Sequence, residues 1–349
     1  MKLNKLGFTS YFEEQVMDEQ QNRTVARIIL EHKHSYRVLG EQGEWLATVS
    51  GHFAYGTNSR LDYPAVGDWV VVEKMPGEEK AIIHQLLKRK SSFVRKVAGR
   101  EIEQQIVAAN VDIVFLVMSL NDDFNIRRLE RYITAAWDSG AKPVIVLTKL
   151  DLCEDPIPYI NEITRHAPGV EYILTSAITN EGVAQLKELL QEGVTAALLG
   201  SSGAGKSSLT NALMESDSMK VSAIREDDDK GRHTTTHREL LMLPAGGCLI
   251  DTPGMRELQL WDQRESLDAS FKDIEALAMQ CRFRDCTHSK EPHCAVLLAI
   301  EEGELEVARL QSYLKLGKEI AFLEKKLTTQ AKLDEKRKQK KLSKGTKRK

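Results

Sequence analysis

Short runs of alternating apolar and polar residues fill the first part of the chain. Five such runs, rich in β-branched and aromatic residues, occupy residues 23–30, 35–39, 44–50, 68–73 and 80–87. Glycine and proline separate these runs, as is typical of turns between strands. Five short strands in so small a region favour a closed β-barrel of the OB-fold type. Residues 1–20, before the barrel, are mostly polar and predict only a short helix or a loose arm.

Beyond residue 100 the pattern changes to apolar strands that alternate with amphipathic helices. Residues 111–118 form an apolar run interrupted only by Asp112, which indicates a strand buried on both faces. Residues 125–138 carry apolar side chains at helical spacing and end at Gly140. A second helix is predicted over residues 183–190, and further strands over residues 143–147, 171–174, 195–199 and 247–250. This alternation predicts a doubly wound α/β domain.

The last part of the chain lacks strand patterns. Residues 265–330 have a helical pattern around a cysteine cluster, and residues 325–349 contain twelve Lys or Arg and two acids. Such a run predicts a disordered or partly helical basic tail, which either contacts phosphates or only aids solubility. The expected organisation is therefore an arm (1–20), a barrel (21–92), an α/β domain (93–264), a helical domain (265–324) and a tail (325–349).

Composition narrows the class of protein. The chain has 349 residues, 42% of them hydrophobic, and a formal net charge of −2. It can therefore bury several cores, and only its C-terminus is strongly basic. Neither a secretory signal nor an apolar run of about 18 residues is visible, so we expect a soluble, cytoplasmic protein without a membrane segment. We also expect a monomer.

The glycine-rich stretch GSSGAGKS at residues 200–207 follows a predicted strand and opens a predicted helix. This context favours a phosphate-binding loop over a flexible glycine–serine turn. Backbone N–H groups of such a loop surround phosphate oxygens, and the helix N-terminus adds further donors. Lys206 would reach the β- and γ-phosphates, and Ser207 would bind Mg²⁺.

A second phosphate-side motif, DTPG, begins at Asp251 after another predicted strand. Asp251 can hold Mg²⁺ through water, and the N–H of Gly254 can meet a γ-phosphate. The stretch TKLD at residues 148–151 also ends a strand and resembles the guanine-reading N/T-K-x-D motif of GTPases. The Asp151 carboxylate would accept both the N1–H and the 2-amino protons of guanine, which adenine lacks, and the Lys149 stem would cover the base. TSA at residues 175–177 resembles the loop that contacts guanine O6.

The motifs occur in the order TKLD, TSA, GSSGAGKS, GRHTTT and DTPG, so the base-reading pair precedes the phosphate loop. A parallel sheet permits this circular permutation, because its sites assemble at strand C-termini. Together with the barrel and the cysteine–histidine domain, over roughly residues 20–310, the chain resembles the ribosome small subunit-dependent GTPase A family. One departure from the general GTPase pattern is Thr148 in place of Asn, which we expect to weaken the tie to the phosphate loop.

The resemblance implies a fold, a site and a mechanism. The fold is α/β, a circularly permuted P-loop GTPase domain between an N-terminal OB-fold barrel and a C-terminal, mainly helical zinc-binding domain. The nucleotide is GTP or GDP with Mg²⁺. The implied nucleotide-binding residues are Thr148, Lys149, Leu150, Asp151, Ser176, Ala177, Gly200, Ser201, Ser202, Gly203, Ala204, Gly205, Lys206, Ser207, Ser208, Asp251 and Gly254.

Many GTPases place Gln just after D-x-x-G to orient the attacking water, but Met255 stands there in this chain. His233 resembles the switch histidine proposed as catalytic in the family, and Arg232 could instead stabilise transition-state charge. Thr234 or Thr235 would bind Mg²⁺ and the γ-phosphate, and we favour Thr235. The predicted catalytic residues are therefore His233, Thr235 and Lys206. Alternatively, His233 and Arg232 are solvated loop residues or RNA contacts.

Three cysteines and one histidine cluster as C-x4-C-x-H-x5-C: Cys281, Cys286, His288 and Cys294. Three thiolates and one imidazole make a closed tetrahedral set that suits one structural Zn²⁺, whereas buried free thiols would not need this clustering. His293 is a rival ligand, but it adjoins Cys294 and is hard to fit into the same tetrahedron.

The implied function is a GTPase that binds the small (30S) ribosomal subunit and assists its late maturation, with hydrolysis stimulated by the subunit. The barrel, the zinc domain and the tail would contact 16S rRNA. Two alternatives stay open from the residues alone. One is a regulatory GTPase with a protein partner, and the other is an RNA-binding protein in which GTP is only a structural ligand.

Overall fold

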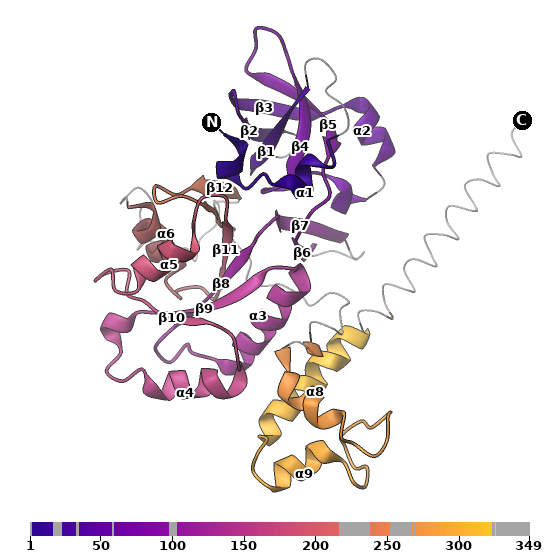
Figure 1. Ribbon diagram of the computed structural model, residues 1–349, viewed down its shortest axis with the longest axis vertical. Coiled ribbons are helices and arrows are strands. Elements are labelled where there is room, and N and C mark those ends of the chain that lie inside the picture. Colours follow the sequence, from indigo (N-terminus) through magenta and orange to yellow (C-terminus); the bar gives the residue numbers. More distant parts are fainter. Residues whose placement is uncertain are drawn as a thin grey trace, which may run out of the picture. The chain divides into compact units, whose positions relative to one another are not determined.

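The structure is a computed structural model (Figure 1). It describes residues 2–16, 23–32, 35–57, 59–97, 103–215, 238–251, 267–268, 270–322 and 325; the side chains of residues 95–97, 103–104 and 251 are not included. The chain divides into two compact units, Met1–Gln259 and Leu260–Lys349.

A closed five-stranded barrel occupies the N-terminal part of the first unit. Its strands are β1 (Arg23–Glu31), β2 (Tyr36–Gly40), β3 (Gly43–Val49), β4 (Trp69–Lys74) and β5 (Lys80–Leu86). The order β1-β2-β3-β5-β4 closes because β4 pairs back with β1; β3 and β5 are parallel, and the other pairs are antiparallel. Alternate residues, among them Ile28, Val38 and Val70, fill the interior. The predicted OB-like barrel is confirmed.

The N-terminal residues pack on the barrel through apolar side chains. A 3-10 turn, η1 (Leu3–Leu6), is followed by the short helix α1 (Ser10–Glu13). Leu6 and Phe12 are buried. Phe8 and Phe12 lie against the indole of Trp69, with ring centroids 4.9 and 5.8 Å away. Of the two forms predicted for this stretch, the loose arm is therefore wrong for residues 2–16, because Phe12 is buried and Phe8 packs beside it on the buried ring of Trp69.

A mainly parallel sheet forms the centre of the first unit. Its parallel strands are β8 (Ile113–Ser119), β9 (Lys142–Thr148), β10 (Tyr172–Leu174), β11 (Thr195–Gly200) and β13 (Cys248–Asp251), in the order β10-β9-β8-β11-β13. The strand β12 (Glu239–Met242) follows β13 and is antiparallel to it. The carboxyl ends of β9 and β11 meet at the same edge of the sheet, as a doubly wound fold requires.

Helices cover both faces of this sheet. The helices α5 (Val183–Leu189) and α6 (Lys206–Met214) share one buried cluster with Phe115 and Val117 of β8. The helix α3 (Ile126–Ser139) packs on β8 and β9 and contacts α4 (Ile157–His166). Asn125 caps α3 by accepting a hydrogen bond from the N–H of Arg128, 2.9 Å away, and Gly140 ends it at φ +86°. Trp137, predicted on the apolar face of α3, is 38% exposed.

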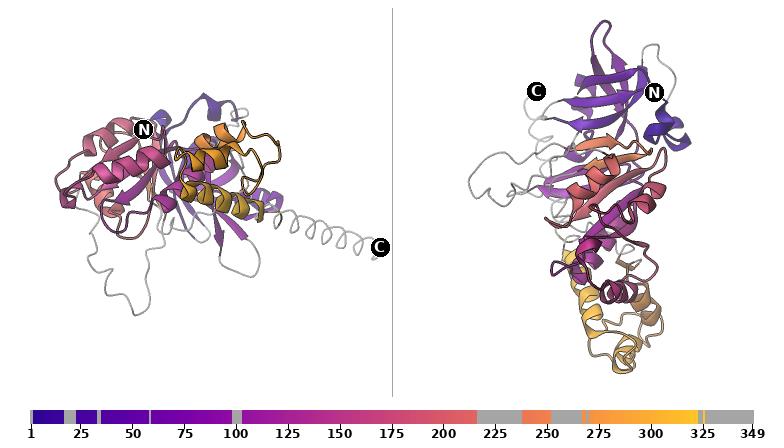
Figure 2. Two further views of the ribbon diagram at one scale, coloured as in Figure 1. Left: turned by 90° about the horizontal axis from the view of Figure 1, so that it is seen from below. Right: turned by 90° about the vertical axis from the view of Figure 1, so that its left-hand side faces the viewer.

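Three features of the first unit were not predicted from the sequence. The strands β6 (Ser92–Val97) and β7 (Glu103–Ala109) form a separate antiparallel hairpin, and α4 was not anticipated. In addition, β12 pairs with β1 through Glu239 and Leu30, so the barrel continues the central sheet into one sheet of eleven strands. In the right-hand view of Figure 2, barrel strands, β12, β13 and β11 follow one another along this sheet.

Arg27 of β1 joins the barrel to the central sheet from inside the unit. It is 1% exposed, and burial lowers the pKa of its guanidinium. The guanidinium donates to the carbonyl of Leu6, to the carbonyls of Gly67 and Asn110 at 3.1 Å each, and to Thr195 Oγ1 at 2.8 Å. Because Thr195 begins β11, one side chain connects the N-terminal residues, the barrel and the strand that leads into the phosphate loop.

The second unit is helical in its described residues. It contains α8 (Lys272–Ala278), α9 (Ala295–Glu301) and a further helix over residues 307–322. The buried guanidinium of Arg309 donates to both carboxylate oxygens of Asp273, at 2.5 and 2.6 Å, and so ties the last helix to α8. Within the described part of the chain, no helix is long and apolar enough to cross a membrane.

Candidate functional site

The phosphate loop lies between the end of β11 and the start of α6. Gly203 and Gly205 adopt φ values of +74° and +89°, which favour glycine. Gly200 is required for a different reason, since a Cβ there would lie 2.4 Å from the carbonyl oxygen of Val117 on β8. The residues predicted to surround phosphates therefore occupy a tight strand–loop–helix turn that leads into the N-terminus of α6.

Lys206 folds back over this loop. Its Nζ donates to the carbonyl oxygens of Gly200 and Ser201 at 2.8 and 2.5 Å. The hydroxyl of Ser201 donates to Asp123 Oδ2 at 2.6 Å. Asp123 follows the carboxyl end of β8 and was missed from the sequence; the polar run after a buried strand was the available signal. The ammonium is thus held at the loop, where it can meet an anionic ligand.

The base-reading motif stands at the end of β9. Lys149 adopts φ +61°, and the 3-10 turn Leu150–Leu152 follows it. The N–H of Leu150 donates to the carbonyl of Thr175 at 3.1 Å. Asp151 is exposed, and its Oδ1 accepts a hydrogen bond from the hydroxyl of buried Ser176 at 2.6 Å. Ser176 therefore fixes a carboxylate that still faces solvent and can accept further donors.

The two motifs contact each other through Thr148. Its hydroxyl donates to the carbonyl of Ala204 in the phosphate loop at 2.6 Å. A Cβ on Gly205 would lie 3.3 Å from this hydroxyl, so the absence of a side chain permits the approach. Thr148 thus keeps a bond to the phosphate loop, because the glycine loop comes close enough for a short threonine side chain.

A hollow of about 690 Å³ lies beside the two motifs, between α5 and α6. It is lined by Ala177 and Ser208 together with Ile178, Asn180, Val183, Ala184, Lys187, Asn211, Ala212 and Glu215. Small-molecule sites usually have volumes of about 300–1,000 Å³. The hollow thus brings residues after TSA and residues after the phosphate loop to one ligand-sized space.

The remaining predicted residues of this site fall into two groups. Asp251 is the last residue of β13, next to β11 in the sheet, and only its backbone is described. His233, Thr235 and Gly254 lie outside the described residues, as do Arg232, Thr234 and Met255. The predicted basic tail also lies outside them, apart from Lys325.

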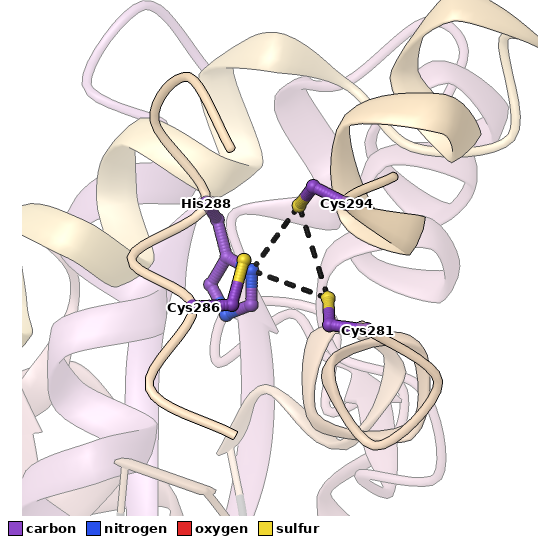
Figure 3. Close-up of side chains that lie close together, drawn as sticks. All are labelled: Cys281, Cys286, His288 and Cys294. Carbon is purple, nitrogen blue, oxygen red and sulfur yellow. Dashed lines mark hydrogen bonds between the residues drawn. The ribbon is translucent and has the colours of Figure 1, made fainter. Parts of the chain in front are cut away.

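The cysteine–histidine cluster assembles in the second unit (Figure 3). Cys281 Sγ lies 3.8 Å from Cys294 Sγ and 3.7 Å from His288 Nδ1, and His288 Nδ1 lies 3.4 Å from Cys294 Sγ. The four ligand atoms, including that of Cys286, lie within 4.8 Å of one another. Metal–sulfur bonds of about 2.3 Å in a tetrahedron place sulfur atoms about 3.8 Å apart. The cluster can therefore hold one metal ion.

The loop that carries His288 is organised by Glu291. Its carboxylate accepts hydrogen bonds from the N–H groups of Thr287, Ser289 and Lys290, at 2.9 to 3.0 Å, and from the Thr287 hydroxyl. These bonds hold the pKa of Glu291 well below its usual range. His293, the rival ligand, is exposed and is not part of the cluster.

Comparisons with known proteins agree with this geometry. A family model described as RsgA GTPase matches residues 86–261. A relative from Oceanobacillus iheyensis, "Small ribosomal subunit biogenesis GTPase RsgA 1", is 45% identical over 98% of this chain and 98% of its own length. A relative from Lactiplantibacillus plantarum, RsgA 2, is 45% identical over 92% of this chain and 90% of its own length.

Solved structures are similar over most of the chain. YjeQ from Thermotoga maritima has 29% identity and a TM-score of 0.65 over 86% of this chain and 99% of its own. YloQ, described as a circularly permuted GTPase, has 26% identity and a TM-score of 0.63 over 87% and 98%.

A second family model, described as ABC transporter, matches residues 183–349. This segment includes the phosphate loop, which ATP- and GTP-binding proteins share, but not Asp151, the residue predicted to read guanine. The relatives that match almost the whole chain, together with the permuted order of the motifs, favour the RsgA GTPase model over the ABC transporter model. The chain belongs to the RsgA GTPase family and is a GTP-hydrolysing enzyme.

Proposed function

We propose that this GTPase binds the small (30S) ribosomal subunit and assists its late maturation, with GTP hydrolysis to GDP and phosphate stimulated by the subunit. The observation that carries this proposal is the match, over 98% of both chains, to a relative named for small ribosomal subunit biogenesis. The protein acts as a cytoplasmic monomer, and its barrel, second unit and basic tail contact 16S rRNA.

The nucleotide lies between the two contacting motifs. Asp151, held by Ser176, reads guanine, and the Lys149 stem covers the base beside Leu150 and Ala177. The phosphates lie on the loop Gly200–Gly205, where Lys206 exchanges its two carbonyl partners for the β- and γ-phosphates. Ser207, Thr235 and Asp251 would hold Mg²⁺, which would supply positive charge against the phosphates, and Gly254 would meet the γ-phosphate. Thr148 supports this proposal, since its bond to Ala204 joins base reading to phosphate binding.

Co-sedimentation tests the partner. The full chain with a non-hydrolysable GTP analogue should sediment with purified 30S particles, and RNase treatment of the particles should release it. The same chain with 50S particles is the control. If the chain stays in the supernatant, or binds an isolated protein instead of the particle, the protein has a different partner and the proposal fails.

Replacing Asp151 by Asn should lower GTP affinity by at least about tenfold, because a charged hydrogen-bond partner that the bound base covers contributes about 1–3 kcal/mol or more. The amide would donate where the carboxylate accepted, so XTP, which carries a carbonyl in place of the 2-amino group, should regain affinity. Nucleotide Kd values, measured by fluorescence titration, check this. Asp155→Asn, on a nearby turn, is the control. Unchanged GTP affinity would mean that TKLD does not read the base.

The cluster Cys281, Cys286, His288 and Cys294 holds one structural Zn²⁺. Its closed ligand set leaves no position for substrate, so the ion stabilises the second unit and takes no part in hydrolysis. Groups that orient metal ligands contribute about 10–100-fold in metal affinity. Glu291, which fixes the loop on both sides of His288, is such a group.

Glu291→Ala should therefore weaken Zn²⁺ binding about tenfold, measured by competition with a chelator. Cys286→Ala should lose the metal, while nucleotide binding by the first unit persists. Asp285→Ala, an exposed neighbouring acid, is the matched control and should retain wild-type affinity. Purified protein without zinc would contradict the assignment, and equal affinity of the Glu291 and Asp285 variants would contradict the role of Glu291.

A further inference from the structure

Arg238 is the first described residue after residues 216–237, and its side chain reaches two other parts of the unit. Its Nη1 lies 3.3 Å from Glu31 Oε2 at the end of β1. The guanidinium also donates to the carbonyl of Ile106 at 3.3 Å and to Gln105 Oε1 at 3.4 Å, both on β7. Gln105 Nε2 donates in turn to Glu31 Oε1 at 3.5 Å. These three side chains, Arg238, Glu31 and Gln105, are called the Arg238 anchor.

The anchor is largely buried. The side chains of Arg238 and Glu31 are 14% and 25% exposed. Burial raises the pKa of the Glu31 carboxyl above its usual range, and Arg238 opposes that effect. Buried ion pairs are often retained for a defined geometry rather than for net stability, because desolvation offsets most of their attraction. The geometry fixed here is the point at which the chain enters β12.

That point is shared by two predicted phosphate-side segments. Glu239, next to Arg238, pairs with Leu30 of β1 on one side and with Asp251 of β13 on the other. Asp251 begins the DTPG motif, and residues 231–237, which carry His233 and Thr235, directly precede Arg238 in the sequence. Both segments therefore join the β12–β13 pair at the same end, and the anchor holds that end against the barrel and the β6–β7 hairpin.

We propose that Arg238 is a positioning residue for GTP hydrolysis: through Glu31 and Gln105 it fixes the end of β12 from which residues 231–237 extend. The inference rests on the proposed role of those residues in hydrolysis. Arg238 itself needs no contact with the nucleotide. Its planar fork matches three acceptors on two different elements, which a single ammonium group cannot do. The anchor thereby links the start of β12 to the barrel and to the β6–β7 hairpin.

Arg238→Gln should lower kcat for GTP about tenfold, since small displacements of catalytic groups reduce rates strongly, while GTP and GDP affinities stay within about threefold. Glu31→Gln should also lower kcat. The double variant should be no slower than Arg238→Gln, because residues of one network are not additive. Arg238→Lys, which keeps the charge, should recover part of the rate. Single-turnover hydrolysis by the full chain, without ribosomal particles, measures these rates.

Arg165→Gln provides the control. Arg165 forms an ion pair with Glu162 on α4, the helix that connects β9 to β10. These two strands are separated from β12 by β8, β11 and β13 in the sheet, so the loss of Arg165 should leave kcat unchanged. Wild-type kcat in Arg238→Gln would overturn the inference. An equal loss of nucleotide affinity and kcat would also overturn it, since this would indicate general destabilisation. Additive losses in the double variant would overturn it as well, since they would indicate that Arg238 and Glu31 act independently. If both Arg238→Gln and His233→Ala hydrolyse GTP at the wild-type rate, the proposed catalytic role of residues 231–237 is wrong, and not only the role of the anchor.

Discussion

Replacing His233 by Ala should lower subunit-stimulated GTP turnover by about 100-fold or more, the usual scale for a lost general base. Met255 has no polar group with which to orient water, and an imidazole near pH 7 can accept a proton or orient the nucleophile. GTP affinity should change by only a few-fold, because the predicted base and phosphate contacts of Asp151 and Lys206 remain. Rapid-quench hydrolysis together with nucleotide titration separates the two effects.

Two further variants of the same segment complete the test, one as a control and one for the competing assignment. His237→Ala removes an imidazole from the same stretch and should hydrolyse GTP at the wild-type rate. Arg232→Ala tests the competing assignment, in which a guanidinium stabilises transition-state charge. Wild-type turnover in His233→Ala, with an inactive Arg232→Ala variant, would move the catalytic role to the arginine.

Replacing Arg27 by Leu should destabilise the first unit by about 3 kcal/mol or more, because three carbonyl oxygens lose a buried charged donor at about 1–3 kcal/mol each. For a unit of this size the thermal midpoint should fall on the order of 10 °C. Since Arg27 connects the N-terminal residues, the barrel and β11, the barrel and the nucleotide-binding part should lose structure together. Calorimetry with and without GDP measures the unfolding of the barrel and of the nucleotide-binding part.

Arg23→Leu is the matched control, because Arg23 is an exposed residue of the same strand. Its effect should stay within about 0.5 kcal/mol. If Arg27→Leu unfolds at the wild-type temperature, the bonds of Arg27 do not stabilise the unit. If only the barrel unfolds early, Arg27 does not join the barrel to the central sheet.

Local patterns in the sequence were sufficient to predict the barrel, the parallel strands and the phosphate loop. The strands around residues 113–119 and 195–200 are almost entirely apolar because both faces are covered, and α3 carries its own cap and stop signals. The metal cluster was predicted for the same reason, since its four ligands lie within fourteen consecutive residues, 281–294. Such features depend on neighbours close in the sequence.

Features that depend on contacts between distant segments were not predicted. Arg27 occupies a strand position where a charged side chain ordinarily faces water, and its partners at Leu6, Gly67, Asn110 and Thr195 explain its burial. The strands β6 and β7 form a two-stranded sheet of their own, and β12 has only four residues and is fixed by pairing with β1 and β13. Thr148 bonds to Ala204 because Gly205 permits a close approach that spacing alone does not reveal.

The central claim, a GTPase that acts on the small ribosomal subunit, is tested most directly by GTP turnover with and without purified 30S particles. The rate should rise by at least about tenfold with 30S particles, as with other trans-acting partners of GTPases, and should not rise with 50S particles. ATP should not replace GTP in the same assay. An equal rate of GTP hydrolysis with and without 30S particles would contradict the claim.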